Sequence, residues 1–182
     1  MNVYQWKADV ECRWVTTRSE QELDRFVFEG DSRMKGWIVP QMAWILDEQG
    51  DAKRAITDCP NFVSGVPVLS ARAVAALGPL LADVGELLPL DFAPHSYYAV
   101  NVTRVIDALD EQQSEVVRFP SSGRVMTVNS FVFRRPAVAG QAVFKDVRLA
   151  RSSVFVLDAF VETVAQAGLT GFVFTRIWSD HG

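Results

Sequence analysis

The chain has 182 residues, of which 49% are apolar and 22% charged, and this ordinary globular composition excludes an intrinsically disordered protein. No apolar run reaches the roughly 18 residues of a membrane helix, because Asp83 and Glu86 interrupt the longest apolar stretch, 74–90. The N-terminus shows no basic stretch followed by an apolar one, and the only cysteines are Cys12 and Cys59. We therefore expect a cytoplasmic protein in a reducing compartment, with no membrane partner.

The net charge of −4 conceals a segregation of charge along the chain. Residues 1–117 carry a net charge of −8 and residues 152–182 a net charge of −2. Residues 118–151 carry a net charge of +6, from seven basic side chains and one acidic side chain. Such segregation concerns partners rather than fold. The simplest interpretation is that the basic side chains line solvent-exposed faces of strands.

The first region, 1–65, is predicted to be irregular and rich in β-structure. Polar turns at 29–31 and 48–51 separate its apolar segments. Short strands are expected at 10–15, 26–29 and 43–46.

The second region, 66–182, is predicted to be an α+β core that forms one compact domain with the first. Its earliest clear element is a helix over 71–82, for which Ser70 is a favourable N-cap. Gly78 and Pro79 are expected to kink or re-initiate this helix, because proline has no N–H to donate.

Strand signals follow this helix, with the first of them broken by Pro89 and two of them joined by a four-residue turn at 120–123. The predicted strands are 87–92, 97–102, 115–119, 124–133, 142–145, 154–157 and 171–178.

A last helix over 159–167 is predicted, capped by Asp158 and ended by Gly168 in the left-handed conformation. Strands and helices do not alternate regularly along the chain. We therefore expect an α+β fold with a mainly antiparallel sheet and two or three packed helices.

No catalytic motif is present: the sequence lacks the phosphate-binding, dinucleotide-binding, zinc-protease and serine-hydrolase signatures. His95 beside Ser96 could pair as base and nucleophile, but adjacent residues on an extended segment point to opposite sides. Neither Cys12 nor Cys59 lies next to a histidine in the sequence. We predict no catalytic residue, no cofactor and no metal.

A run of carboxylates occupies the segment 104–115. If 104–113 is helical, Asp107 and Glu111 lie on one face of that helix. The run is interpreted first as a solvated acidic face; a hydrolytic pair or a divalent-cation site is the alternative. Its members are Asp107, Asp110, Glu111 and Glu115.

The same region resembles a known family. The sequence Tyr-Tyr-Ala-Val-Asn-Val over 97–102, followed by 105–110 and Ser-Glu at 114–115, is similar to the central signature of the eleventh numbered Imm family, which are bacterial immunity proteins of polymorphic toxin systems. The segments 155–161 and 167–172 resemble its second signature. Weaker similarity comes from 66–70, 28–30 and 36–37, whereas Pro40 and the basic segment 134–151 depart from the usual pattern.

The resemblance implies a cytoplasmic protein that binds and neutralises a cognate toxin domain, often a nuclease, by stoichiometric occlusion. The acidic face of Asp107, Asp110, Glu111 and Glu115 is then the candidate toxin-binding surface. The candidate aromatic anchors are Trp14, Trp37 and Trp44, although tryptophan also serves in cores.

Two alternatives stay open. The basic segment 118–151 with Phe119, Phe131, Phe133 and Phe144 could bind nucleic acid, although the isoelectric point near 5.2 argues against this. A carboxylate-dependent enzyme with its site near Asp107 is the second alternative.

Overall fold

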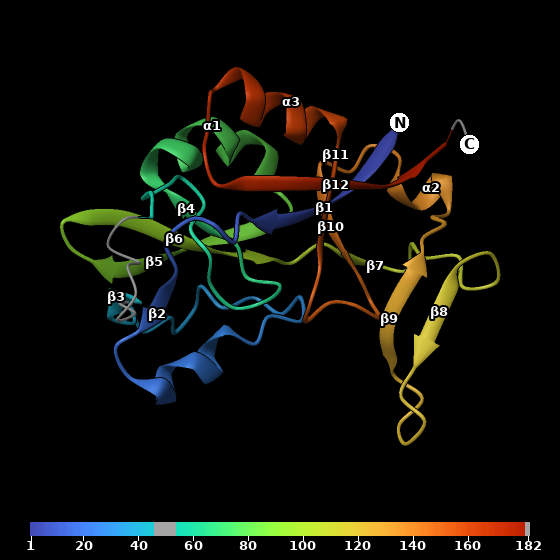
Figure 1. Ribbon diagram of the computed structural model, residues 1–182, viewed down its shortest axis with the longest axis horizontal. Coiled ribbons are helices and arrows are strands. Elements are labelled where there is room, and N and C mark those ends of the chain that lie inside the picture. The colour runs from blue at the N-terminus through green and yellow to red at the C-terminus, as the bar shows by residue number, and fades with distance from the viewer. Residues whose placement is uncertain (46–53, 181–182) are drawn as a thin grey trace.

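The computed structural model describes residues 1–45 and 54–180 (Figure 1). Within them the chain forms twelve strands, three α-helices and a 3-10 helix, and most strand pairs are antiparallel. The predicted α+β class is confirmed. No helix in these two ranges has the length and apolar character needed to span a membrane.

The main sheet has five strands in the order β12-β1-β11-β10-β7, of which only β10 and β7 pair in parallel. Its strands are β1 (Asn2–Ala8), β7 (Val105–Ile106), β10 (Val143–Asp146), β11 (Val154–Leu157) and β12 (Phe172–Ser179). The predictions for 142–145, 154–157 and 171–178 are confirmed. Because β1 lies between β11 and β12, the first strand of the chain shares a sheet with the last.

The strand β1 has no counterpart among the predictions. Its buried residues are Val3 and Trp6, which are three positions apart, because the register against β12 shifts between Val3 and Tyr4. This irregularity conceals the period of two that marks a strand. The division of the chain into 1–65 and 66–182 stays a prediction.

The rest of the N-terminal region is less regular than predicted. The strand expected at 10–15 is wrong, because β2 (Val15–Thr17) begins only at its last residue and pairs with β3 (Met42–Trp44). The strand expected at 26–29 is also wrong, since a 3-10 helix, Glu20–Phe26, ends there. The turn predicted at 48–51, and Leu46 of the strand at 43–46, lie outside the described residues.

A second sheet contains β4 (Val68–Ser70), β6 (His95–Val102) and β5 (Gly85–Phe92), with β6 in the centre. The strand at 97–102 is confirmed, but the break predicted at Pro89 is wrong. Pro89 lies on the edge strand β5, and its carbonyl accepts a hydrogen bond from Trp37 Nε1 at 2.9 Å on the outer side of the sheet. A proline is tolerated there because its missing N–H is not needed by a neighbouring strand.

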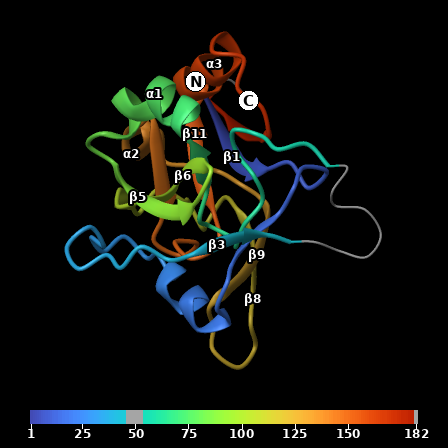
Figure 2. The ribbon, with the colours of Figure 1, turned by 90° about the vertical axis from the view of Figure 1, so that its left-hand side faces the viewer.

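The helix α1 (Ala71–Leu81) confirms the predicted cap, since Ser70 Oγ accepts a hydrogen bond from Ala73 N at 3.1 Å. It is a single helix, so re-initiation at Gly78-Pro79 is wrong, whereas the kink that was the other expectation stays a prediction. Pro79 lies in its last turn, where only one intrahelical bond is lost. Its buried side chains, Ala73, Leu77 and Leu81, pack with α3 (Asp158–Gln166) over the main sheet (Figures 1 and 2).

Asp158 does not cap α3, contrary to the prediction. Its carboxylate instead accepts hydrogen bonds from Asn2 N at 2.9 Å and from Tyr4 Oη at 3.1 Å, and so fastens α3 to β1. The predicted end of the helix is confirmed. Gly168 has φ +58°, Leu169 N donates to Val164 O at 3.1 Å, and Gly168 N donates to Ala165 O at 3.1 Å, which together form a Schellman motif.

The hairpin of β8 (Glu115–Arg118) and β9 (Val125–Ser130) confirms the predicted turn, although β9 is shorter than expected. It projects from the body of the molecule, with its turn farthest from α1 and α3 (Figure 1). The short helix α2 (Arg135–Val138) follows it. Beneath the hairpin, a third apolar cluster surrounds Phe133, Phe144 and Phe155.

The glycine before β12 has no steric room for a side chain. Gly171 has φ +85°, and a Cβ there would overlap Thr57 Oγ1 and lie 2.6 Å from the carbonyl oxygen of Cys59. We expect Gly171→Ala to lower the free energy of unfolding by about 2–4 kcal/mol in urea denaturation. Gly140→Ala is the control, since Gly140 has φ +78° with nothing within 4 Å, and it should cost only about 1 kcal/mol. Equal losses would contradict the role of the overlap.

Candidate functional site

Asp107, Asp110 and Glu111 lie on the connection between β7 and β8, and Glu115 is the first residue of β8. The connection is a loop with a turn and not the helix considered for 104–113. The connection does not form a helix because a side chain from elsewhere in the sequence binds two of its backbone amides. Asp146 Oδ2 accepts hydrogen bonds from Ala108 N at 2.9 Å and from Leu109 N at 2.8 Å. These amides are therefore occupied by a buried carboxylate and cannot enter a helical ladder.

Arg148 brings two of the predicted carboxylates together. Its Nη1 lies 2.6 Å from Asp107 Oδ1, and its Nε donates to Glu111 Oε1. The same guanidinium lies 3.3 Å from Asp146 Oδ1, whose side chain is fully buried. The expectation of one helical face for Asp107 and Glu111 is therefore wrong, and a shared cation brings their carboxylates together instead.

Two further arginines complete this ion-pair network. Arg134 Nη2 lies 2.5 Å from Asp107 Oδ1, and Arg118 donates to Glu111. Every cation of the network comes from the basic segment 118–151, whereas Asp107 and Glu111 come from the acidic segment before it. The two segments that are segregated in the sequence therefore neutralise each other in space.

The other two carboxylates have no ion-pair partner within residues 1–45 and 54–180. Asp110 accepts hydrogen bonds from Gln113 Nε2 at 2.6 Å and from Gln112 N at 3.1 Å. Glu115 accepts a hydrogen bond from Asn129 Nδ2 at 3.0 Å. Among the four, the negative charges without an ion pair in these ranges are therefore those of Asp110, in the loop, and Glu115, at the start of β8.

Hydrogen bonds and nearby charges favour the ionised forms of Asp107, Asp110 and Arg148. Hydrogen bonds from Arg148 and then Arg134 lower the pKa of Asp107, and the hydrogen bond from Gln113 lowers the pKa of Asp110. Burial disfavours the charge of Arg148, but its bonds to Asp107 and its proximity to Asp146 outweigh burial and raise its pKa. The side chain of Asp107 is 59% exposed, so its ion pairs orient the loop more than they stabilise the fold.

The basic segment 118–151 contains seven cations. Among its arginines, Arg124 is the one whose guanidinium has no hydrogen bond or ion pair in the part of the chain that the structure describes. Arg135 lies 3.2 Å from Asp180, and Lys145 is fully buried. Arg151 places Nε and Nη2 at 2.5 and 2.9 Å from the two carboxylate oxygens of Glu29. The positive charge counted in the sequence is thus largely compensated within the fold.

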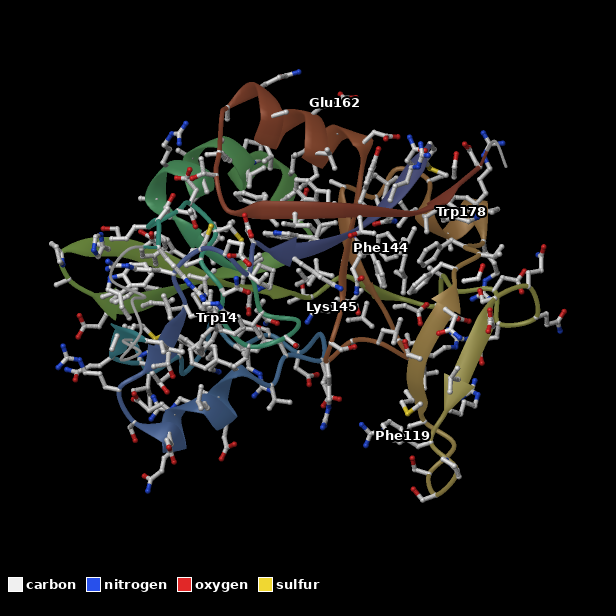
Figure 3. All side chains as sticks on the ribbon, viewed as in Figure 1. Trp14, Phe119, Phe144, Lys145, Glu162 and Trp178 are labelled. Carbon is white, nitrogen blue, oxygen red and sulfur yellow. The ribbon has the colours of Figure 1, made fainter. Side chains whose placement is uncertain are left out.

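The aromatic residues of the nucleic-acid alternative are mostly unavailable for stacking. Phe133 and Phe144 are buried, and Phe131 stacks on Phe133 with ring centroids 5.8 Å apart. Of the four, Phe119 alone is exposed, on the hairpin turn (Figure 3). A surface for successive nucleotides would need several exposed rings.

The three candidate tryptophan anchors lie with the N-terminal strands and not with the carboxylates. Trp37 and Trp44 are half-buried against the second apolar cluster, in which Trp44 packs on Phe92 with ring centroids 4.7 Å apart. Trp14 is half-buried as well, and its Nε1 donates to Val10 O at 3.2 Å. In Figure 3, Trp14 lies left of centre and apart from Phe119 at the lower right.

The remaining candidates for nucleophilic chemistry are held in packed surroundings. Burial raises the pKa of Cys59 to about 12, and burial also raises the pKa of Cys12, so both thiols stay protonated. His95 packs edge-on to Phe92 and Trp44, with ring centroids 5.8 and 5.7 Å away. Within residues 1–45 and 54–180, no group of three or more histidine, cysteine, aspartate or glutamate side chains has an arrangement that could hold a metal ion.

The sequence analysis missed Arg148 and Asp146 as the organising residues of this site. A signal was available, because Asp146 is the single acidic residue within the basic segment 118–151. The donors that bind its carboxylate could not be predicted, since the amides of Ala108 and Leu109 lie 38 and 37 positions away along the chain.

Comparison with known proteins agrees with the resemblance of the signature segments. The profile of the immunity protein family Imm11 matches residues 45–179, which is more than half of the chain and includes the ion-pair network. A search of curated proteins finds no match. With a family match of this extent, the chain belongs to the Imm11 immunity protein family.

Proposed function

We propose that this protein binds a cognate toxin domain and neutralises it by stoichiometric occlusion, without covalent change to the toxin. The family match is the observation that supports this function. Protection by occlusion requires a stable interface, which takes about 800 Å² of surface on each partner. The two free cysteines favour a reducing compartment, and we place the encounter in the cytoplasm.

We further propose that the connection between β7 and β8 contacts the toxin. Asp110 and Glu115 present its uncompensated negative charge, while Asp107 and Glu111 are held by arginines and keep the loop in place. A basic surface, such as the substrate cleft of a nuclease, is the partner that this charge would attract. Complementary charge accelerates association more than it slows dissociation.

Co-expression with the toxin-like domain encoded beside this gene tests the function. We expect the protein to restore growth, to co-purify with the domain as a one-to-one complex, and to leave the mass of the domain unchanged. Failure to bind and to rescue would refute the function for that pair. Rescue with a covalently altered toxin would instead show an enzyme.

Removing the free charge of the loop tests the surface. We expect the double substitution Asp110→Asn with Glu115→Gln to slow association with the toxin domain by about three- to tenfold at low salt, with little change in the dissociation rate. Surface plasmon resonance at several salt concentrations measures both rates. The control is Asp83→Asn with Glu162→Gln, which removes the same charge from two side chains with no ion-pair partner in the described ranges.

Two results would count against the proposed surface without counting against the proposed function. An association rate equal to that of the wild-type protein would contradict the proposed surface, while the rescue experiment could still support the function. Neutralising all four carboxylates without any loss of toxin affinity would exclude the acidic loop altogether.

A further inference from the structure

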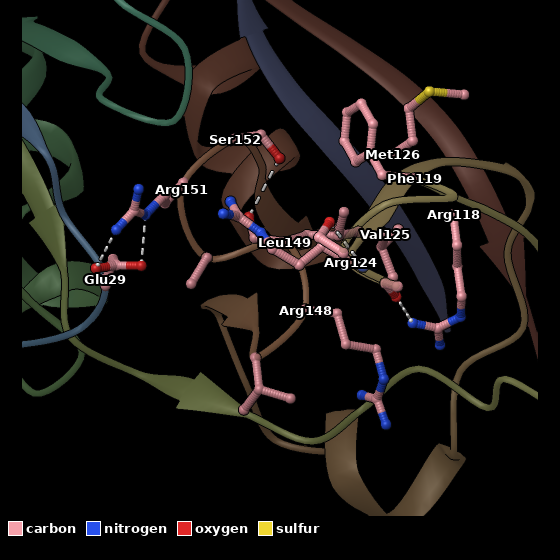
Figure 4. Close-up of a pocket in the computed structure, with 14 residues that line it drawn as sticks. Glu29, Arg118, Phe119, Arg124, Val125, Met126, Arg148, Leu149, Arg151 and Ser152 are labelled. Atoms are coloured by element: carbon pink, nitrogen blue, oxygen red, sulfur yellow. Dashed lines mark hydrogen bonds and ion pairs between the residues drawn. The ribbon is translucent and has the colours of Figure 1, made fainter.

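A groove with a volume of about 660 Å³ lies between the hairpin turn and the segment that joins β10 to β11 (Figure 4). Four arginines line it, whereas Glu29 is the one acidic residue of its lining. The arginines are Arg118, Arg124, Arg148 and Arg151. The β8–β9 hairpin supplies Arg118 and Arg124, and the β10–β11 connection supplies Arg148 and Arg151.

Three of these arginines are held in place by carboxylates. Glu111 accepts from both Arg118 and Arg148, and Glu29 accepts two hydrogen bonds from Arg151 (Figure 4). A guanidinium has five N–H donors, so each of these side chains retains donors for a further acceptor. Because the side chains are already oriented, an incoming carboxylate loses little of its binding energy to ordering them.

Arg124 differs from the other three. No hydrogen bond or ion pair engages its guanidinium within residues 1–45 and 54–180. Its side chain is exposed on the hairpin and lines the groove, where it acts on Glu29 through Coulomb attraction alone, so its hydrogen-bond donors remain available to a ligand. Within the described residues, Arg124 is thus a cation without an ion pair, as Asp110 and Glu115 are carboxylates without one.

Exposed apolar side chains accompany the arginines. Phe119, Met126 and Val147 line the same groove, with exposed fractions of 45%, 50% and 51%. Phenylalanine, methionine and arginine are residue types enriched at protein interfaces. The groove therefore offers cations and apolar surface within one concave site.

We infer that this groove captures an acidic segment of the toxin domain, with a carboxylate on Arg124 and its neighbours and an adjacent apolar side chain on Phe119, Met126 and Val147. The inference rests on the proposed function and adds a second, oppositely charged contact to it. A surface with negative charge on the loop and positive charge in the groove admits a partner in one orientation only, because the reversed orientation brings like charges together.

The charges favour a protein segment over nucleic acid. Binding to a phosphate backbone draws on several uncompensated cations in a row. In the groove, carboxylates already engage Arg118, Arg148 and Arg151, which leaves Arg124 as the unbalanced cation. One free cation beside an apolar patch matches a single carboxylate with an apolar neighbour.

Arg124→Glu and Phe119→Ser test the inference by isothermal titration with the toxin domain. We expect each substitution to weaken binding by about tenfold or more, which is the effect of losing a central interface contact. Arg176→Glu is the matched control, because Arg176 is exposed on β12 and does not line the groove, so this variant should bind like the wild-type protein. Unchanged thermal unfolding of all three variants shows that the fold is intact.

The outcomes separate the inference from the function on which it rests. If the wild-type protein binds the toxin domain and both groove variants bind equally well, the inference is overturned and the function stands. If the wild-type protein does not bind the domain, the function fails and the inference with it. Restored binding of Arg124→Glu by an Asp→Lys or Glu→Lys substitution in the toxin would confirm the contact.

Labelled single-stranded DNA and RNA oligonucleotides provide the last arm of the test. We expect no salt-dependent binding of either oligonucleotide to the wild-type protein. Binding that falls steeply with salt and is lost in Arg124→Glu would make the groove a nucleic-acid site and overturn the inference.

Discussion

Asp146→Ala should lower the free energy of unfolding by about 3–5 kcal/mol, because it removes a fully buried carboxylate from four donors. The backbone amides of Ala108 and Leu109 would lose their acceptor, and both residues are themselves fully buried. An unsatisfied buried donor costs about 1–3 kcal/mol. Arg148 would also lose the only fully buried carboxylate among the three that it contacts.

Urea denaturation measures this loss. Asp146→Asn should cost less than the alanine variant, because its side-chain oxygen can still accept from the two amides. The control is Asp83→Ala, in which an exposed aspartate is removed, and it should change stability by less than about 0.5 kcal/mol. If Asp146→Ala proves as stable as this control, the β7–β8 connection does not depend on the buried carboxylate.

Lys145→Met should have the opposite effect and raise the free energy of unfolding by about 1–2 kcal/mol at pH 7. Lys145 is fully buried, and its Nζ donates one hydrogen bond, to Phe28 O at 3.0 Å. Burial lowers the pKa of Lys145 from 10.5 to about 8, which corresponds to a cost of about 3 kcal/mol for the charged form. Methionine removes this cost and keeps the volume, while the unpaired carbonyl of Phe28 offsets about 1 kcal/mol.

The same substitution should alter the pH dependence of stability. The folded protein holds the Lys145 proton less tightly than the unfolded chain does, so the unfolded chain binds more protons between about pH 8 and 10.5. The contribution of Lys145 to stability is therefore unfavourable below pH 8 and improves as the pH rises through this window. The advantage of Lys145→Met should shrink accordingly by pH 10.5.

The comparison must be made as a difference between the two proteins. Burial raises the pKa of Cys59 and of Tyr97 to about 12, so stability due to these groups falls in alkaline solution in both proteins. Lys7→Met is the control, since Lys7 is exposed and its replacement should change the free energy of unfolding by less than about 0.5 kcal/mol. A constant difference between wild-type and Lys145→Met from pH 7 to pH 10.5 would contradict the buried charge.

The elements that were predicted correctly depend on residues within a few positions of one another. The N-cap of α1 involves Ser70 and Ala73, and the end of α3 involves Val164, Gly168 and Leu169. The turn of the β8–β9 hairpin spans four residues in the same way. Such signals can be predicted because the hydrogen bonds that they describe are local.

Two of the predictions that proved wrong concern positions where a distant residue overrides the local preference. Asp158 would cap α3 by itself, but Asn2 and Tyr4 of β1 take its carboxylate. The segment 104–113 has helical spacing of its charges, but Asp146 takes two of its backbone amides. In both cases a side chain that is far away in sequence competes for the same hydrogen bonds.

The sequence by itself determined the α+β class, the family resemblance and the separation of acidic from basic segments. Only the tertiary structure decided how those charges are used. Arg148 reaches Glu111 and Asp107 across 37 and 41 positions of sequence, and strand pairing of β10 with β7 brings them together. Coulomb attraction depends on distance in space, which composition and spacing do not contain, so the free charges of Asp110, Glu115 and Arg124 emerge only from the fold.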